Sequence, residues 1–140
     1  MKKLRILQVV NSLLSGGAEK LVVETSLKFI EAGHHVDILL LKTYDSPLSR
    51  QLAANDDITV FSLGTNTNIY NPICIRKISK YLKQHAYDVV HAHLFPPFYW
   101  VAMAKNASKK TVFIHTEHNT DNRRMNNRYL HFIENFMYKK

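Results

Sequence analysis

Short apolar runs alternate with amphipathic segments along the whole chain. The apolar runs show little internal alternation, which is typical of strands buried on both faces of a sheet. They span residues 4–10, 34–42, 58–63, 87–93 and 111–116. Helical spacing of apolar residues predicts helices over 18–32, 48–55, 72–85 and 96–106, with a last one around 129–137. This alternation predicts an α/β fold, a doubly wound parallel sheet of Rossmann-like type with helices on both faces.

Several residues at element boundaries support these assignments. Gly33 follows the first helix in the position that favours a left-handed backbone, and Ser46-Pro47 has the cap and first-turn residues of a helix start. No strand follows the last predicted helix. We therefore expect the sheet to be truncated before its last strand, so that residues 1–140 form a single incomplete domain at the front of a longer protein.

Composition narrows the class of protein. A chain of 140 residues with 46% hydrophobic and 21% charged residues suits one globular domain. The single cysteine, Cys74, cannot form an internal disulfide, which fits a reducing, cytoplasmic compartment. Gln8 and Asn11 interrupt the first apolar run, so it indicates a strand and not a secretory signal.

Positive charge is concentrated on one predicted helix. The formal net charge is +8, and Arg76, Lys77, Lys80 and Lys83 share one face of helix 72–85. A solvated helix face is the simplest interpretation, and an anionic membrane surface or an acidic substrate is the alternative. Nucleic acid is not expected as a partner, because aromatic residues do not interleave with these charges.

A polar loop with two glycines joins the first strand to the first helix. Gly16 and Gly17 allow a left-handed backbone and leave no side chain in the way of an approaching group. Free N–H groups of the first helical turn point into the same space, so the corner attracts anions. A tight turn without ligand is the alternative, since the pair lacks the spacing of the dinucleotide motif.

Histidines gather where the fourth and fifth strands end. Ligands of an open parallel sheet bind beyond the carboxyl ends of its strands, at the point where the strand order reverses. His91 and His115 fit buried structural positions, whereas His93 and His118 lie further out and are the better candidates for ligand contact. Three of these rings could also hold a zinc ion.

Other polar and aromatic residues lie at the same edge. Phe95 opens a dense aromatic run that packs mostly in the core but could line an acceptor pocket, and the loop with Asn119, Arg123 and Arg124 could hold an anionic or hydroxyl-rich ligand. Glu117 is a candidate acid or base, although a solvated carboxylate is the default.

Three motifs together resemble a known family. The segments Ser15-Gly16-Gly17-Ala18-Glu19, Tyr87-Asp88-Val89-Val90-His91-Ala92-His93 and Thr116-Glu117-His118-Asn119 are similar, in order and spacing, to the N-terminal domain of family 4 glycosyltransferases, retaining enzymes of the GT-B fold. The resemblance covers nearly the whole chain.

The resemblance implies transfer of a sugar from a nucleotide-sugar donor to a hydroxyl acceptor with retention of configuration, without a metal or other cofactor. It places Gly16 and Gly17 at the donor diphosphate, His118 beside the transferring sugar and His93 on the acceptor side. Phe95, Asn119, Arg123 and Arg124 are further candidates for contact with the acceptor. Acceptors in this family are often glycans, lipid-linked glycans or precursors of surface polysaccharide, which suits a cytoplasmic protein at the inner face of the membrane.

The resemblance also defines what this chain lacks. The nucleotide-binding half of the family lies in a second, C-terminal domain that has no counterpart in this sequence, so we expect the chain alone to be inactive. Two other functions remain open: a flavodoxin-like module that binds a small anion without catalysis, and a metal-dependent hydrolase that uses His91, His93 and His118.

Overall fold

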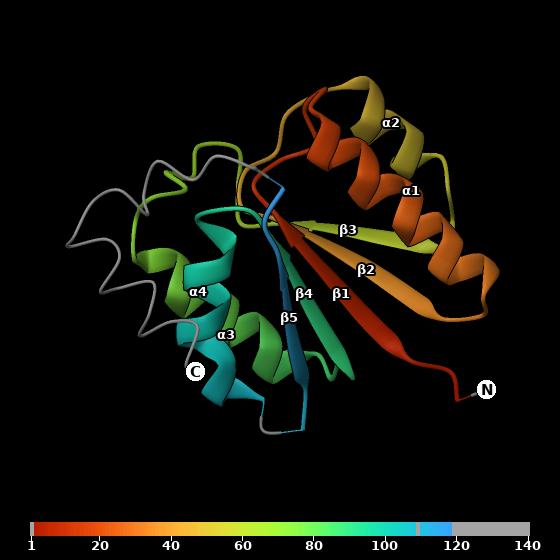
Figure 1. Cartoon of the computed structure of the whole chain (residues 1–140). Helices are drawn as coiled ribbons and strands as arrows, with labels where there is room; N and C mark the ends of the chain where they lie inside the picture. The colour runs from red at the N-terminus through yellow and green to blue at the C-terminus, as the bar shows by residue number, and fades with distance from the viewer. Residues whose placement is uncertain (1, 109, 119–140) are drawn as a thin grey trace.

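A parallel sheet of five strands forms the centre of the domain (Figure 1). The computed structural model describes residues 2–108 and 110–118. The order of the strands across the sheet is β3-β2-β1-β4-β5. Their bounds are β1 Arg5–Val10, β2 His35–Leu40, β3 Ile58–Ser62, β4 Val89–His93 and β5 Val112–Thr116.

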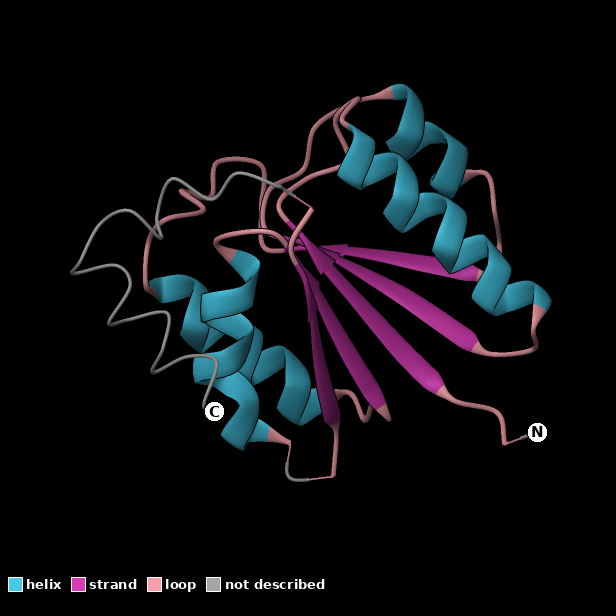
Figure 2. Cartoon of the chain, viewed as in Figure 1, coloured by secondary structure: helices cyan, strands magenta, loops and turns pink. Residues whose placement is uncertain are grey.

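Helices cover both faces of the sheet (Figure 2). The pair α1 and α2 lies on one face, and the pair α3 and α4 lies on the other. Their bounds are α1 Gly17–Glu31, α2 Pro47–Ala53, α3 Ile73–Gln84 and α4 Pro97–Ala104, with a 3₁₀ turn, η1, at Lys105–Ala107. The doubly wound fold and the nine elements predicted up to residue 116 are thus confirmed, whereas the helix predicted around 129–137 lies outside the described residues.

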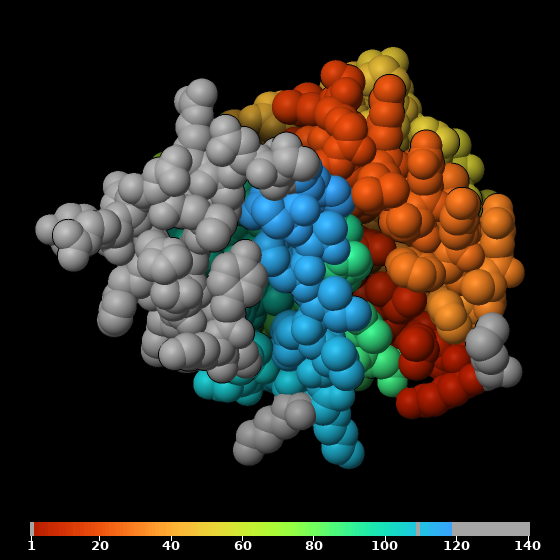
Figure 3. All heavy atoms as spheres, viewed as in Figure 1, coloured from red at the N-terminus to blue at the C-terminus, as the bar shows by residue number. Residues whose placement is uncertain are grey.

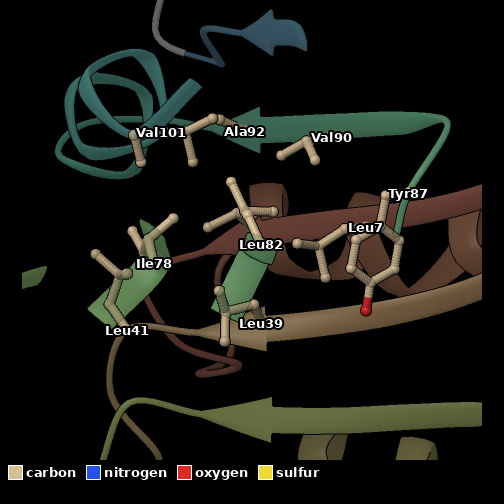
Figure 4. Close-up of a cluster of buried hydrophobic side chains, with 11 residues drawn as sticks. Leu7, Leu39, Leu41, Ile78, Leu82, Tyr87, Val90, Ala92 and Val101 are labelled. Atoms are coloured by element: carbon tan, nitrogen blue, oxygen red, sulfur yellow. The ribbon is translucent and has the colours of Figure 1, made fainter. Parts of the chain in front are cut away.

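Two apolar layers explain why the strands lack alternation. On one face, Leu7 and Val9 of β1 pack with Ile78 and Leu82 of α3 (Figure 4). On the other face, Val10 packs in a second cluster with residues of α1, α2 and β2. Because β1 is covered on both faces, its residues from Ile6 to Val10 are all buried, and all of them except Gln8 are apolar.

The helix ends are formed as the sequence predicts at two sites. The Ser46 hydroxyl caps α2 by accepting from the Ser49 N–H at 3.1 Å, and it donates to the Leu13 carbonyl. Gly33 follows α1 with φ +85°, a conformation that costs a residue with a side chain about 1–2 kcal/mol. The contact between Ser46 and Leu13 ties the start of α2 to the loop that follows β1.

One side of the sheet is open at β5, whose atoms lie at the front surface in Figure 3. Val112 and Ile114 of β5 are 58% and 45% exposed.

The basic residues of α3 are exposed as well, as the sequence predicts: Arg76, Lys77, Lys80 and Lys83. Lys77 also donates to the carbonyl of Leu63 at 2.9 Å.

Candidate functional site

The strand order reverses between β1 and β4. The chain proceeds from β1 outward to β3, then returns to the other side of β1 as β4. Such a reversal separates the loops that follow the two strands and leaves a crevice at their carboxyl ends. Asn11 after β1 crosses this point, and its Nδ2 donates to the Phe95 carbonyl after β4 at 2.8 Å.

Three polar side chains form a hydrogen-bonded chain at this reversal. His93, the last residue of β4, is only 2% exposed. Its Nε2 lies 2.6 Å from Oε1 of Gln8 on β1, and its Nδ1 lies 3.0 Å from Nε2 of His118, just after β5. The chain Gln8–His93–His118 therefore connects three strands of the sheet.

The hydrogen bonds fix the protons within this chain. An amide oxygen only accepts, so Nε2 of His93 carries hydrogen and donates to Gln8. Burial, reinforced by the neighbouring histidines, lowers the pKa of His93 to about 3 and keeps its ring neutral. Nδ1 of His93 must then accept from Nε2–H of His118, so Nδ1 of His118 is the ring nitrogen directed away from this hydrogen-bonded chain.

His91 and His115 lie in packed positions, in line with the structural interpretation of the sequence. Nε2 of His91 shares a hydrogen bond with the Thr116 hydroxyl at 2.7 Å, and burial lowers the pKa of His91 to about 4. The His115 ring stacks on Phe98 with centroids 4.1 Å apart. Glu117 differs from the solvated carboxylate expected: its side chain is only 19% exposed and lies 3.9 Å from Nε2 of His115.

The rings of His91, His93 and His118 lie next to one another, with centroids 4.0 Å apart for His91 and His93 and 5.3 Å apart for His93 and His118. The side chain of His91 is directed to Thr116, and both ring nitrogens of His93 are engaged in hydrogen bonds. Among residues 2–108 and 110–118, no three His, Cys, Asp or Glu side chains are placed to hold a metal ion.

The glycine loop forms the start of α1, but without a left-handed backbone. Gly16 is the N-cap with φ −80° and ψ 165°, and the glycines with positive φ in the described chain are Gly33 and Gly64. The space in front of Gly17 is open, since a Cβ there would meet no atom within 4 Å. A Cβ at Gly16 would lie 2.1 Å from Oε2 of Glu19, so this carboxylate covers the N-terminus of the helix.

The acceptor residues expected from the sequence are described only in part. Phe95 is half-buried, with its ring 5.1 Å from Tyr99 and 5.9 Å from Tyr70. It follows Leu94, whose φ of 62° is rare for a residue with a side chain. Asn119, Arg123 and Arg124 lie outside the described residues.

Two site residues were not found by sequence reasoning as functional candidates. Gln8 is fully buried and Asn11 is half-buried, and each keeps one side-chain atom, Nε2 and Oδ1, without a hydrogen-bond partner among the described residues. Their signal was available, because Gln8 is a polar residue within an apolar strand and Asn11 is the polar residue that directly follows it. Their partners are 85 and 84 positions away, so the sequence could not show the contacts.

Fold and site together define the class: a Rossmann-like α/β domain with a polar, histidine-containing site at its switch point. The chain belongs to Glycosyltransferase Family 4, whose family model matches residues 15–140. No curated protein matches the chain.

A solved structure supports the fold. The crystal structure of a glycosyltransferase from Rickettsia africae ESF-5 is similar, with a TM-score of 0.71 and 23% sequence identity. The similarity covers 99% of this chain but 35% of that protein, so the present chain spans about a third of its length. In the described part of the chain, no helix has the length and apolar character to cross a membrane.

Proposed function

We propose that this chain is the acceptor-side domain of a retaining glycosyltransferase. In this reaction the acceptor hydroxyl forms a bond to the anomeric carbon of a nucleotide-sugar, the bond to the diphosphate breaks, and the nucleoside diphosphate leaves. A second domain, outside this chain, would hold most of the nucleotide. The products would be surface polysaccharide or glycolipid precursors.

The observation that carries the proposal is the hydrogen-bonded chain Gln8–His93–His118 in a member of this family. The fixed tautomer of His93 orients His118, whose Nδ1 can accept a hydrogen bond from a hydroxyl of the donor sugar. A ring held by buried partners needs little reorganisation during the reaction, which favours catalysis. His118 is thus the proposed contact to the transferring sugar.

The start of α1 supplies the second element of the proposal. The leaving diphosphate gains negative charge, and the N–H groups at a helix N-terminus stabilise such charge. The open space in front of Gly17 would let the diphosphate approach the backbone. The Glu19 carboxylate at Gly16 would have to move aside on binding, because like charges repel.

The basic face of α3 supports a location at the inner face of a membrane. Arg76, Lys77, Lys80 and Lys83 are all exposed, and clustered cations each gain about 1 kcal/mol near anionic lipid. Cosedimentation with phosphatidylglycerol vesicles tests this part of the proposal. Substitution of Lys80 and Lys83 by glutamine should reduce binding to these vesicles. Equal binding of both proteins to the anionic vesicles, or equally strong binding of the wild type to neutral phosphatidylcholine vesicles, would contradict it.

Transfer itself is tested on the complete gene product with a panel of radiolabelled nucleotide sugars. We expect the wild type to transfer sugar from one donor or to hydrolyse that donor slowly. His118→Ala should lower the rate of this reaction at least about a hundredfold, which is typical of the loss of a contact to the transition state. His35→Ala, at an exposed position on β2, is the matched control and should keep full activity. The assignment would be refuted if His118→Ala kept wild-type activity, or if the wild type showed no activity with any donor. The 140-residue chain alone should show negligible turnover.

A further inference from the structure

A cavity of about 540 Å³ lies at the carboxyl edge of the sheet beyond β1, β2 and β3. Its volume is in the range typical of small-molecule sites. Its outer wall is the polar loop 64–71. The lining includes Asn11, Lys42, Tyr44, Asn66, Asn68 and Tyr70.

The outer wall of the cavity is anchored to the domain. Trp100 of α4 donates its indole N–H to the Ile69 carbonyl at 2.7 Å, and Oδ1 of Asn68 accepts from the Tyr70 N–H at 3.0 Å. The Tyr70 ring lies 5.9 Å from the ring of Phe95, which belongs to the candidate site. The cavity is therefore preformed, and it borders the switch point.

The lining combines aromatic rings with amides and hydroxyls. Tyr70 is 61% exposed and offers a ring face, while Asn66 and Asn68 supply amide donors and acceptors. Oδ1 of Asn11, at the inner wall, has no hydrogen-bond partner among the described residues. An aromatic face beside several neutral polar groups suits a sugar ring, which has an apolar C–H face and a hydroxyl rim.

The charge of the cavity adds a second requirement. Among the described residues that line it, Lys42 is the one with a charged side chain, and none of them carries a carboxylate. Nζ of Lys42 lies 5.0 Å from the centre of the Tyr44 ring, while the nearby Asp45 is held by Arg50 at 2.8 Å. No ion pair of Lys42 occurs among the residues that the structure describes.

We infer that this cavity binds the acceptor sugar and that the acceptor carries an anionic group, which Lys42 recognises. The sugar ring lies on Tyr70 with its hydroxyls on the asparagines. The anionic group is a carboxylate, as in a uronic acid, or a phosphate ester. This inference rests on the proposed function, since it specifies the acceptor of the same reaction.

Calorimetric binding to the complete gene product tests the inference without requiring transfer. The probes are the methyl glycosides of glucose, galactose and mannose, the corresponding uronic acids, and the corresponding hexose 6-phosphates. We expect at least one acidic sugar to bind about tenfold more tightly than its neutral parent, as one charge-assisted contact would give. Comparison of uronic acids with phosphates identifies the anionic group.

Variants separate the contribution of each wall. Lys42→Gln should reduce the preference for the acidic sugar to about twofold, and Tyr70→Ala should weaken acidic and neutral sugars alike by about tenfold. Lys28→Gln, at an exposed position on α1, is the matched control and should bind as the wild type does. Each of four results would overturn the inference. They are equal affinity for acidic and neutral sugars, no binding of any probe, an unchanged preference for acidic sugars in Lys42→Gln, and binding of inorganic phosphate as tight as that of the acidic sugars.

Transfer assays on the same proteins distinguish this inference from the proposed function. Acidic sugars that bind as described, without transfer to any of them from any donor, would refute the transferase and leave the binding site established. Transfer to neutral acceptors without preference for acidic ones would support the transferase and refute the role of Lys42.

Discussion

His93 and His118 share a hydrogen bond of 3.0 Å between Nδ1 of the first ring and Nε2 of the second. The rings are nearly parallel, with an angle of 19° between their planes. His93 is buried and His118 is half-buried, so the pair connects the interior of the sheet with its edge. Any change that alters the tautomer of the inner ring should therefore alter the outer one.

Gln8→Met tests this connection. The substitution leaves Nε2–H of His93 without an acceptor, which costs about 1–3 kcal/mol. It also removes Nε2 of Gln8, which has no partner among the described residues. We therefore expect the free energy of unfolding, measured in urea, to fall by about 1 kcal/mol. In the complete enzyme kcat should fall about tenfold with an unchanged KM for the donor, because the orientation of His118 is lost while its side chain stays. Ser26→Ala, another fully buried polar residue, is the control for simple destabilisation.

A Gln8→Met enzyme with wild-type kcat would show that the hydrogen bond to His93 has no catalytic consequence. A rise in KM alone would indicate a binding role instead. The double variant Gln8→Met, His118→Ala should be no less active than His118→Ala, since both changes act through the same ring.

The free energy of unfolding should fall as the pH is lowered. The folded-state pKa values of His91 and His93, about 4 and about 3, lie below the unfolded value of 6.5, so the unfolded chain binds more protons under acidic conditions. At pH 5 this linkage costs about 2 kcal/mol for each histidine relative to pH 8. His115 and His118 add repulsion at both sites.

Urea unfolding at pH 8, 6.5 and 5 measures this effect. His91→Asn should remove part of the pH dependence, whereas His35→Asn, at an exposed position, should keep it. A wild-type stability that is constant over this interval would show that neither buried ring resists protonation.

Features of the fold that depend on residues close together in the sequence could be predicted from it, whereas contacts between residues far apart in the sequence could not. Strands such as Arg5–Val10 are recognisable because burial on two faces leaves a continuous apolar run, and Ser46 and Gly33 mark helix ends through contacts within a few residues. The edge where the site lies follows from the alternation of strands and helices alone.

The contacts within the site could not be predicted in the same way. Gln8 and His93 meet because β1 and β4 are neighbours, an order that the sequence pattern does not specify. Sequence reasoning placed His93 towards the ligand, but the structure buries it between Gln8 and His118. Whether it also contacts a ligand stays a prediction. The loop 64–71 lacked a signal because asparagine and threonine are common in all surface loops.

Two glycines of similar appearance in the sequence should respond in opposite ways to substitution. Gly17→Val places its side chain in open space at the first position of α1, so stability should change by less than about 0.5 kcal/mol while transfer is lost through obstruction of the diphosphate. Gly33→Ala should lose about 1–2 kcal/mol because its φ is +85°, but keep its activity below the melting temperature. Thermal unfolding measures the stability of both variants, and transfer assays measure their activity. An active Gly17→Val enzyme would refute the role of the glycine loop.

The carboxylate of Glu19 gives a final test of anion binding at the start of α1. Its oxygen lies where a Cβ of Gly16 would be, so it neutralises the positive end of the helix dipole and competes with an incoming diphosphate. Glu19→Gln should therefore bind pyrophosphate about three- to tenfold more tightly in a calorimetric titration, at a cost of about 0.3–1 kcal/mol in stability. Glu24→Gln, an exposed position on the same helix, changes the net charge equally and should not raise the affinity. Equal gains in both variants would show that net charge alone governs the binding, and weaker binding in Glu19→Gln would place Glu19 among the residues that support the ligand.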